Sequence, residues 1–182
     1  MLSPPLRSGL EVEPVGDLEI VVFELGGQRF GVLAANVREL LRAVAVVPLP
    51  RAPAVVQGVI NLRGRVIPVL DVRTRFRIPS KVIEPSDHFI VASIPPHPTL
   101  SPAQGEGKLR DRVVALHGDR ATDLIRLNRA DLEAAQVLVP NAEYVTWVAK
   151  VPDNLVLIHD LATFLSHAES AALEEALPGE GA

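Results

Sequence analysis

The stretch that decides the fold is Gly58 to Ile78, GVINLRGRVIPVLDVRTRFRI. Two nearly continuous apolar runs, VVQGVINL and VIPVLDV, lie on either side of the short turn RGR. Such runs predict two strands that are joined as a hairpin and buried on both faces. Five arginines accompany these strands: Arg63, Arg65, Arg73, Arg75 and Arg77. They would suit a nucleic-acid surface, a catalytic anion site or a docking surface for another protein.

The sequence on both sides of this stretch predicts further strands and turns. Upstream, LEIVVFELGGQRFGVLA suggests a hairpin at Gly26-Gly27, because a two-residue hairpin turn requires positive φ. The stretch 36–44 fits either a helical turn or a strand. Downstream, HFIVASI, RVVALHGDRATDLIRL and EYVTWVAKVPDNLVLIHDL predict more strands. The tail has apolar residues at helical spacing up to Ala176.

Part of the sequence resembles another part at an offset of 89 residues. VINLRGRVIPVLDV (59–72) aligns with VAKVPDNLVLIHDL (148–161), so that Asp71 falls on Asp160 after each final strand. We therefore expect two β-subdomains of similar plan, each a small barrel of about five strands. The second copy has KVPDN in place of NLRGR. Arginines that the fold itself required should occur in both copies, so this difference favours a functional use for Arg63 and Arg65.

Composition excludes several classes of function. The chain has 182 residues, a net charge of −4, 48% hydrophobic residues and 4% aromatic residues. An aliphatic core rich in branched side chains favours β-structure. The absence of cysteine excludes disulfides and thiolate chemistry. The mild negative charge disfavours general binding to nucleic acid. No run is long enough for a membrane helix and the N-terminus does not read as a signal peptide, so we expect a cytoplasmic protein.

No pattern of catalytic or metal-binding residues is visible. The five histidines do not have the spacing of metal ligands, and no nucleophile motif, phosphate-binding loop or dinucleotide fingerprint occurs. We therefore expect no enzyme activity and no cofactor. Asp71 with Arg73 or Arg75 could be a catalytic pair, but a structural ion pair at the strand end is the favoured interpretation. Trp147 lies on a predicted strand and is interpreted as a core residue.

Two stretches of the first half are informative together, FELGGQRFGVLAANVREL and PLPRAPAVVQGVINLRGRVIPVLDVRTRF. They closely resemble the CheW-like family of bacterial chemotaxis scaffolds. The family's mark is a glycine, an apolar pair, Asn-Leu-Arg-Gly, and a strand that ends in Asp-Leu-Arg and an aromatic. The corresponding positions are Gly58, Asn61, Leu62, Arg63, Gly64, Pro68, Asp71, Val72, Arg73 and Phe76, with Phe23, Gly31, Val37 and Glu39 upstream.

The resemblance implies a mostly β fold: two five-stranded SH3-like β-barrels with a short C-terminal helix. It implies a non-catalytic scaffold that couples the cytoplasmic tip of a methyl-accepting chemoreceptor to the regulatory domain of a CheA-type histidine kinase, at membrane-associated receptor arrays. Val37, Glu39 and Arg63 would face the receptor, and Gly58 would affect kinase docking. Asn61 and Gly64 would shape the turn, since both tolerate positive φ.

The expected organisation is a disordered arm at 1–17, a CheW-like domain at 18–167 and a helix with a tail at 168–182. Within the domain, subdomains of about 18–80 and 81–160 are expected, with a flexible insertion at 95–111. The stretch ALHGDRATD departs from the family's usual apolar-Val-Asp-x-Val pattern. The alternative function is a small β-barrel that binds nucleic acid by stacking bases on exposed aromatic side chains.

Overall fold

The computed structural model describes residues 16–94, 112–135, 144–152 and 154–177. The insertion expected at 95–111, and all but two residues of the arm expected at 1–17, lie outside these ranges. The strands are β1 (Leu18–Leu25), β2 (Gln28–Leu33), β3 (Val37–Arg42), β4 (Val56–Leu62), β5 (Arg65–Leu70), β6 (His88–Ile94), β7 (Arg112–Gly118), β8 (Arg120–Leu127), β9 (Leu132–Ala134), β10 (Val145–Val151) and β11 (Asn154–His159). The helical elements are η1 (Ala34–Asn36), η2 (Val72–Phe76), η3 (Arg129–Asp131), η4 (Leu161–Thr163) and α2 (His167–Ala176).

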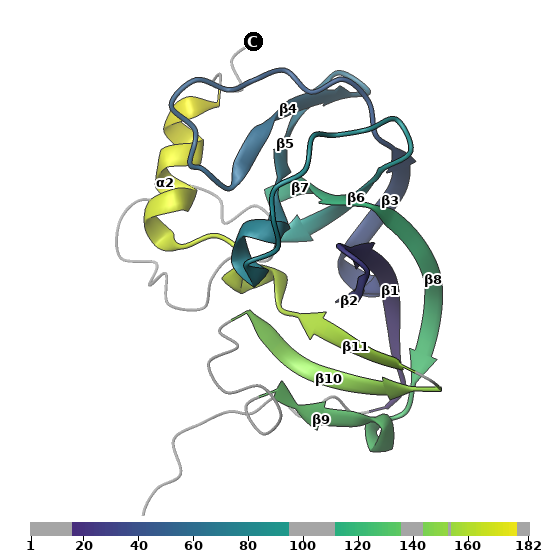
Figure 1. The fold of residues 1–182 in the computed structure, drawn as a ribbon. Helices are drawn as coiled ribbons and strands as arrows, with labels where there is room; N and C mark the ends of the chain where they lie inside the picture. The colour runs from purple at the N-terminus through teal and green to yellow at the C-terminus, as the bar shows by residue number, and fades with distance from the viewer. Residues whose placement is uncertain (1–15, 95–111, 136–143, 153, 178–182) are drawn as a thin grey trace, which may run out of the picture.

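The strands form two sheets that lie one above the other in Figure 1. One sheet has five strands in the order β3-β6-β7-β5-β4, and the other has six in the order β8-β1-β2-β11-β10-β9. We call them the upper and lower barrel, after their places in that view. The backbone of Val47 pairs with Val59 and links the chain beyond β3 to β4, the strand at the opposite end of the upper order. The predicted fold class, two small SH3-like barrels and a C-terminal helix, is confirmed.

The predicted boundary between subdomains near residue 80 is wrong. The upper barrel is formed by β3 to β7, five strands that follow one another in the sequence. The lower barrel combines β1 and β2 with β8 to β11, so the chain leaves it and later returns. Two parallel pairings, β5 with β7 and β11 with β2, join the hairpins within each barrel. A hairpin pattern in the sequence does not specify which distant strand the hairpin will pair with, and this is why the boundary was misplaced.

The internal repeat at an offset of 89 residues is a structural repeat. Val59 pairs with Pro68 in the β4–β5 hairpin, and Val148 pairs with Leu157 in the β10–β11 hairpin, in the same register. Each hairpin leads into a 3-10 helix whose N-cap is an aspartate, Asp71 or Asp160. Each aspartate accepts a hydrogen bond from the backbone N–H two residues later. The shared aspartates therefore end equivalent strands in the two barrels.

Three apolar cores explain why the strands read as continuous apolar runs. One core fills each barrel, and the largest lies between the barrels. Strand β1 contributes to two of them, with Ile20 and Val22 inside the lower barrel and Val21 in the core between the barrels. Strand β6 likewise contributes to two cores, the one inside the upper barrel and the one between the barrels. Burial on both faces removes the alternation that a half-exposed strand would show.

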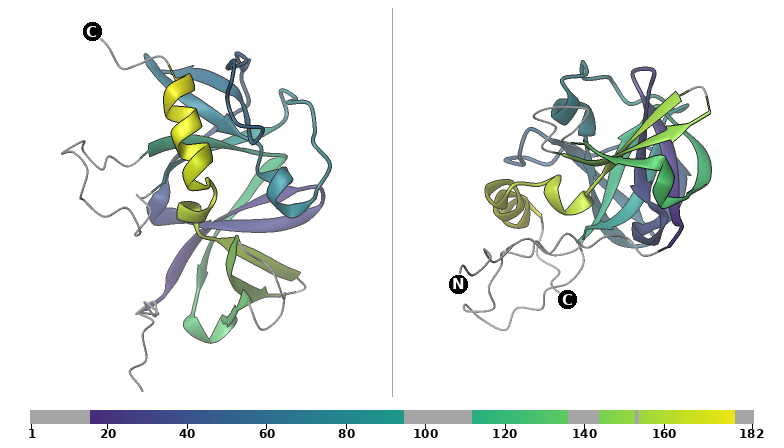
Figure 2. Two further views of the ribbon diagram at one scale, coloured as in Figure 1. Left: turned by 90° about the vertical axis from the view of Figure 1, so that its left-hand side faces the viewer. Right: turned by 90° about the horizontal axis from the view of Figure 1, so that it is seen from below.

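The C-terminal helix α2 lies against the upper barrel, as Figure 1 and the left-hand view of Figure 2 show. Ser166 and Glu169 form a reciprocal capping box at its first turn. Leu173 is buried in the core between the barrels, and Arg112 of β7 pairs with Glu174. In the part of the chain that the structure describes, no helix is long and apolar enough to cross a membrane.

Candidate functional site

The turn between β4 and β5 presents Arg63 to solvent. Leu62 pairs with Arg65, so Arg63 and Gly64 form a two-residue loop. Both residues have positive φ, 52° and 84°, as a type I′ hairpin turn requires. The Asn61 side chain accepts a hydrogen bond of 2.8 Å from the Gly64 N–H. Gly64 has the positive φ that the sequence predicts, but Asn61 does not: Asn61 contacts the turn through its side chain, and the other residue with positive φ is Arg63 at the tip.

An exposed ion pair connects this turn to strand β3. Arg63 Nη2 lies 2.8 Å from Glu39 Oε2, and the side chains are 79% and 26% exposed. Strands β3 and β4 stand at opposite ends of the upper sheet order, so the pair crosses the line where the barrel closes. Surface ion pairs of this kind contribute at most about 1 kcal/mol to stability. The arrangement therefore leaves most of the guanidinium available to a partner.

Strand β3 brings two of the predicted receptor residues together. Val37 and Glu39 lie on the same strand, which bulges between them. Val37 is half-buried and packs against the core between the barrels, so most of its side chain has a structural role. Leu40 is a large apolar residue on this strand that is 47% exposed. The surface formed by β3 and the β4–β5 turn is called the Arg63 surface below.

The five arginines of the opening stretch have different roles. Arg73 is buried and pairs with Asp119, while Arg75 donates to the carbonyl of Phe164 and pairs with Glu169 of α2. The expected ion pair between Asp71 and Arg73 or Arg75 is wrong, because Asp71 accepts from the Arg73 backbone N–H instead. The other three, Arg63, Arg65 and Arg77, are exposed.

Gly58 has a structural reason to be glycine. Its φ is 149° and it lies at a bulge in the pairing of β4 with β5. A Cβ atom there would overlap the carbonyl oxygen of Val47 and would lie 2.6 Å from Cγ1 of Val46. The close approach lets the 46–47 segment pair with β4 and complete the barrel. A side chain at Gly58 would displace this segment.

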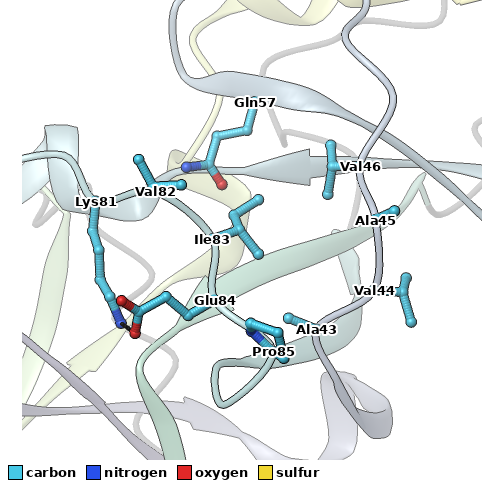
Figure 3. Close-up of a pocket in the computed structure, with 10 residues that line it drawn as sticks. All are labelled: Ala43, Val44, Ala45, Val46, Gln57, Lys81, Val82, Ile83, Glu84 and Pro85. Carbon is cyan, nitrogen blue, oxygen red and sulfur yellow. Dashed lines mark ion pairs between the residues drawn. The ribbon is translucent and has the colours of Figure 1, made fainter.

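Next to Gly58 lies a groove of about 630 Å³ with largely apolar walls (Figure 3). One wall is the extended segment 43–46, and the other is the connector 81–85. Gln57 lies at one end, and Lys81 and Glu84 form an ion pair of 3.1 Å at another. Val44 is 50% exposed and Val82 is 85% exposed, so the groove brings apolar surface to solvent. The sequence signal that could have located it is the apolar run AVAVV at 43–47.

A network of charged groups beneath the groove was not predicted. Lys81 donates to Asp87 at 2.6 Å, and Asp87 Oδ2 lies 2.9 Å from Nε2 of the fully buried His117. Burial alone raises the pKa of Asp87, but hydrogen bonds from Lys81 and from the Glu84 N–H outweigh it and hold the pKa below its ordinary value. An ionised Asp87 only accepts, so Nε2 of His117 carries the proton.

The described residues provide neither a base-stacking platform nor a metal site. All seven aromatic side chains lie in the described ranges and every one is buried or half-buried. Trp147, interpreted from the sequence as a core residue, is half-buried and packs against the interior of the lower barrel. Among the described residues, no group of three histidine, aspartate or glutamate side chains is placed to hold a metal ion.

Comparison with protein families identifies the domain. A model of the CheW-like domain family matches residues 19–169. The chain belongs to this family. The resemblance to CheW-like chemotaxis adaptors seen in the sequence is therefore confirmed, and it extends through both barrels and into the first residues of α2.

Similar proteins are known from several bacteria. The chain is 29% identical over 161 residues to a chemotaxis protein CheW of Rhizobium meliloti, covering 86% of this chain and 94% of the relative. It is 24% identical over 153 residues to one of Treponema pallidum, covering 83% and 84%. Over 70 residues it is 48% identical to the protein FrzA of Myxococcus xanthus, covering 38% and 42%. The crystal structure of the scaffolding protein TtCheW from Thermoanaerobacter tengcongensis has the same fold, with a TM-score of 0.68 at 24% identity, over 84% of this chain and 94% of that one.

Proposed function

We propose that this chain is a non-catalytic scaffold that couples chemoreceptors to a CheA-type histidine kinase. The family and the names of its relatives support a role in chemotaxis. Its partners would be the cytoplasmic tip of a methyl-accepting chemoreceptor and the regulatory domain of the kinase, and it would work in the cytoplasm at receptor arrays. A scaffold of this kind needs two separate binding surfaces, and the upper barrel offers two candidates.

The Arg63 surface is the proposed receptor site, and Arg63 is the observation that carries it. Its side chain is 79% exposed, and the backbone at the turn adopts a conformation that an arginine rarely takes. Backbone strain of this kind is typical of functional positions. Arginine is enriched at interface hot spots because its planar guanidinium forms paired hydrogen bonds with carboxylates and carbonyls. Glu39 would hold the guanidinium in place until a receptor carboxylate or carbonyl binds it.

The groove beside Gly58 is the proposed kinase site. Its exposed valines give it the apolar character of an interface centre, and Lys81 and Glu84 give it a charged margin. Gly58 would act on kinase docking indirectly, because a side chain there displaces the 46–47 segment beside the groove wall. The groove and the Arg63 surface share no residue, so the two partners could bind at once.

The first prediction separates the two surfaces. Arg63→Glu should weaken binding of a receptor tip fragment at least tenfold in calorimetric titration, because it removes the guanidinium and places a second negative charge beside Glu39. Binding of the kinase regulatory domain should stay within about twofold of wild type, since the groove is not altered.

A matched control exists in the lower barrel. Arg126 of β8 is 69% exposed and forms a 2.7 Å ion pair with Glu19, so Arg126→Glu makes the same charge change in a similar pair. This variant should bind both partners normally. Wild-type receptor affinity in Arg63→Glu, or an equal loss in Arg126→Glu, would show that the Arg63 surface is not the receptor site.

A further inference from the structure

Lys81 contacts three carboxylates, two of them in its own stretch of chain before β6 and one, Asp119, 38 residues further along. Its ammonium nitrogen lies 2.6 Å from Asp87, 3.1 Å from Glu84 and 3.3 Å from Asp119. Asp87 is almost completely buried, and Lys81 itself is only about one-third exposed. A buried carboxylate that loses its cation becomes an uncompensated charge. These contacts therefore fix Lys81 firmly and, with it, the chain segment that follows.

Asp87 connects both walls of the groove. Its carboxylate accepts a 2.8 Å hydrogen bond from the Glu84 N–H, which fixes the 81–85 wall. Its backbone carbonyl accepts a 2.8 Å hydrogen bond from the N–H of Ala43, where the opposite wall begins. His117 of β7 approaches the same carboxylate from within the barrel. The width of the groove thus depends on one buried residue and on the lysine that neutralises it.

Asp119 extends the same network to the lower barrel. Asp119 lies between β7 and β8, where the chain passes from one barrel to the other. Its carboxylate accepts a 2.7 Å hydrogen bond from the N–H of Gly26 in the β1–β2 turn, and it pairs with the buried Arg73. The Lys81 ammonium group bridges Asp87 on the groove side and Asp119 on the side of the lower barrel. Hydrogen-bonded networks in buried surroundings are stronger and more rigid than isolated pairs.

We propose that Lys81 is a positioning residue that holds the groove in its binding shape and couples it to the β1–β2 turn of the lower barrel. The proposal rests on the assignment of the groove to the kinase. A partner that moves the 81–85 wall changes the position of Lys81, and the change reaches Gly26 through Asp119. Coupling of this kind requires only that the partner bind one arrangement of the network more tightly than the other.

The test uses Lys81→Met in the full chain. Amide hydrogen exchange in the free protein should speed up at 82–84 and 43–46, and also at Gly26. The kinase regulatory domain should bind at least tenfold more weakly, and the receptor tip should bind as it does to wild type. In wild type, kinase binding should move the NMR signal of the Gly26 amide, and the variant should lose this response. Lys81→Arg should restore binding.

Two further variants keep the result interpretable. Lys81→Met combined with Asp87→Asn removes both charges, so it avoids a lone buried carboxylate if the single variant does not fold. Lys150→Met removes an ion-paired lysine from the lower barrel and should leave all readouts unchanged. Unchanged exchange at the groove and at Gly26 in the folded Lys81 variants, or unchanged kinase affinity, would overturn the inference. Failure of wild type to bind the kinase would overturn the proposed function instead, and the exchange rates would still decide the coupling.

Discussion

Arg63 combines an unfavourable backbone with an exposed side chain. Its φ of 52° lies in the left-handed region, where residues with a Cβ atom lose about 1–2 kcal/mol. The equivalent position in the β1–β2 hairpin is Gly26, which has a similar φ of 57°. The same turn type is thus built once with Gly-Gly and once with Arg-Gly. The Arg-Gly turn is therefore less stable than the Gly-Gly turn. A partner that binds the Arg63 guanidinium would explain why an arginine occupies this position.

The cost of the strained backbone at Arg63 can be measured with Arg63→Asn, which creates the Asn-Gly pair that type I′ turns prefer. The free energy of unfolding should rise by about 0.5–1 kcal/mol, because relief of strain exceeds the loss of a surface ion pair. Receptor affinity should fall in the same variant. Urea denaturation and calorimetric titration measure the two effects. A less stable protein would mean that the Arg63–Glu39 pair matters more than the strain.

At the scale of the element, the β4–β5 hairpin carries both proposed sites at its two ends. The turn at one end presents Arg63, and the bulge at Gly58 near the other end admits the 46–47 segment. The equivalent β10–β11 hairpin has the same register in the pairs that follow the bulge. The difference between the two copies therefore lies in local chemistry and not in architecture.

The two glycines of this hairpin should respond differently to alanine. Gly58→Ala should lower the free energy of unfolding by about 2–4 kcal/mol, because the added methyl group overlaps the Val47 backbone and the φ of 149° is strained. Gly64→Ala should cost about 1 kcal/mol, since its φ of 84° is also unfavourable but no atom lies within 4 Å of the new Cβ. Thermal denaturation of both variants checks this order. Equal losses would show that the contact with Val47 is unimportant.

At the scale of the whole molecule, the two barrels are held together by a shared apolar core, and His159 packs against its aromatic residues. His159 at the end of β11 packs against Phe30 of the lower barrel and Phe76 of η2, with ring centroids 5.3 and 4.5 Å away. Its Nδ1 lies 2.9 Å from the Tyr144 carbonyl. Burial lowers the pKa of His159 from 6.5 to about 4, and the Tyr144 hydrogen bond only partly opposes this effect.

This histidine should make the contact between the barrels sensitive to acid. The unfolded chain binds a proton at His159 below about pH 6.5, whereas the folded chain does so only near pH 4. Stability present above pH 6.5 is therefore lost as the pH falls toward 4, by about 3 kcal/mol in total. His159→Phe should flatten this part of the profile in urea denaturation at pH 7 and pH 4.5. As a control, His167→Gln changes an exposed histidine and should leave the pH dependence of stability unchanged. If His159→Phe kept the wild-type pH dependence, His159 would not be its source.

Local features were predictable and long-range partners were not. The Gly26-Gly27 turn and the hairpin around Arg63 follow from residues next to each other in the chain. The same pattern did not distinguish the exposed Arg63 from the buried Arg73, because their carboxylate partners lie 24 and 46 residues away. Asp87 and His117 looked like ordinary polar residues beside strands. Only their burial against each other makes them part of a network.

The sequence by itself determined the family, the strands and the repeated hairpins, because apolar runs, turn glycines and capping aspartates act over a few residues. The tertiary structure decided which hairpin joins which barrel, which arginines remain exposed, and how Lys81 connects a groove to the opposite barrel. These outcomes depend on contacts between residues far apart in the chain, and many different pairings would satisfy the same local pattern. Packing of three cores at once selects one of them.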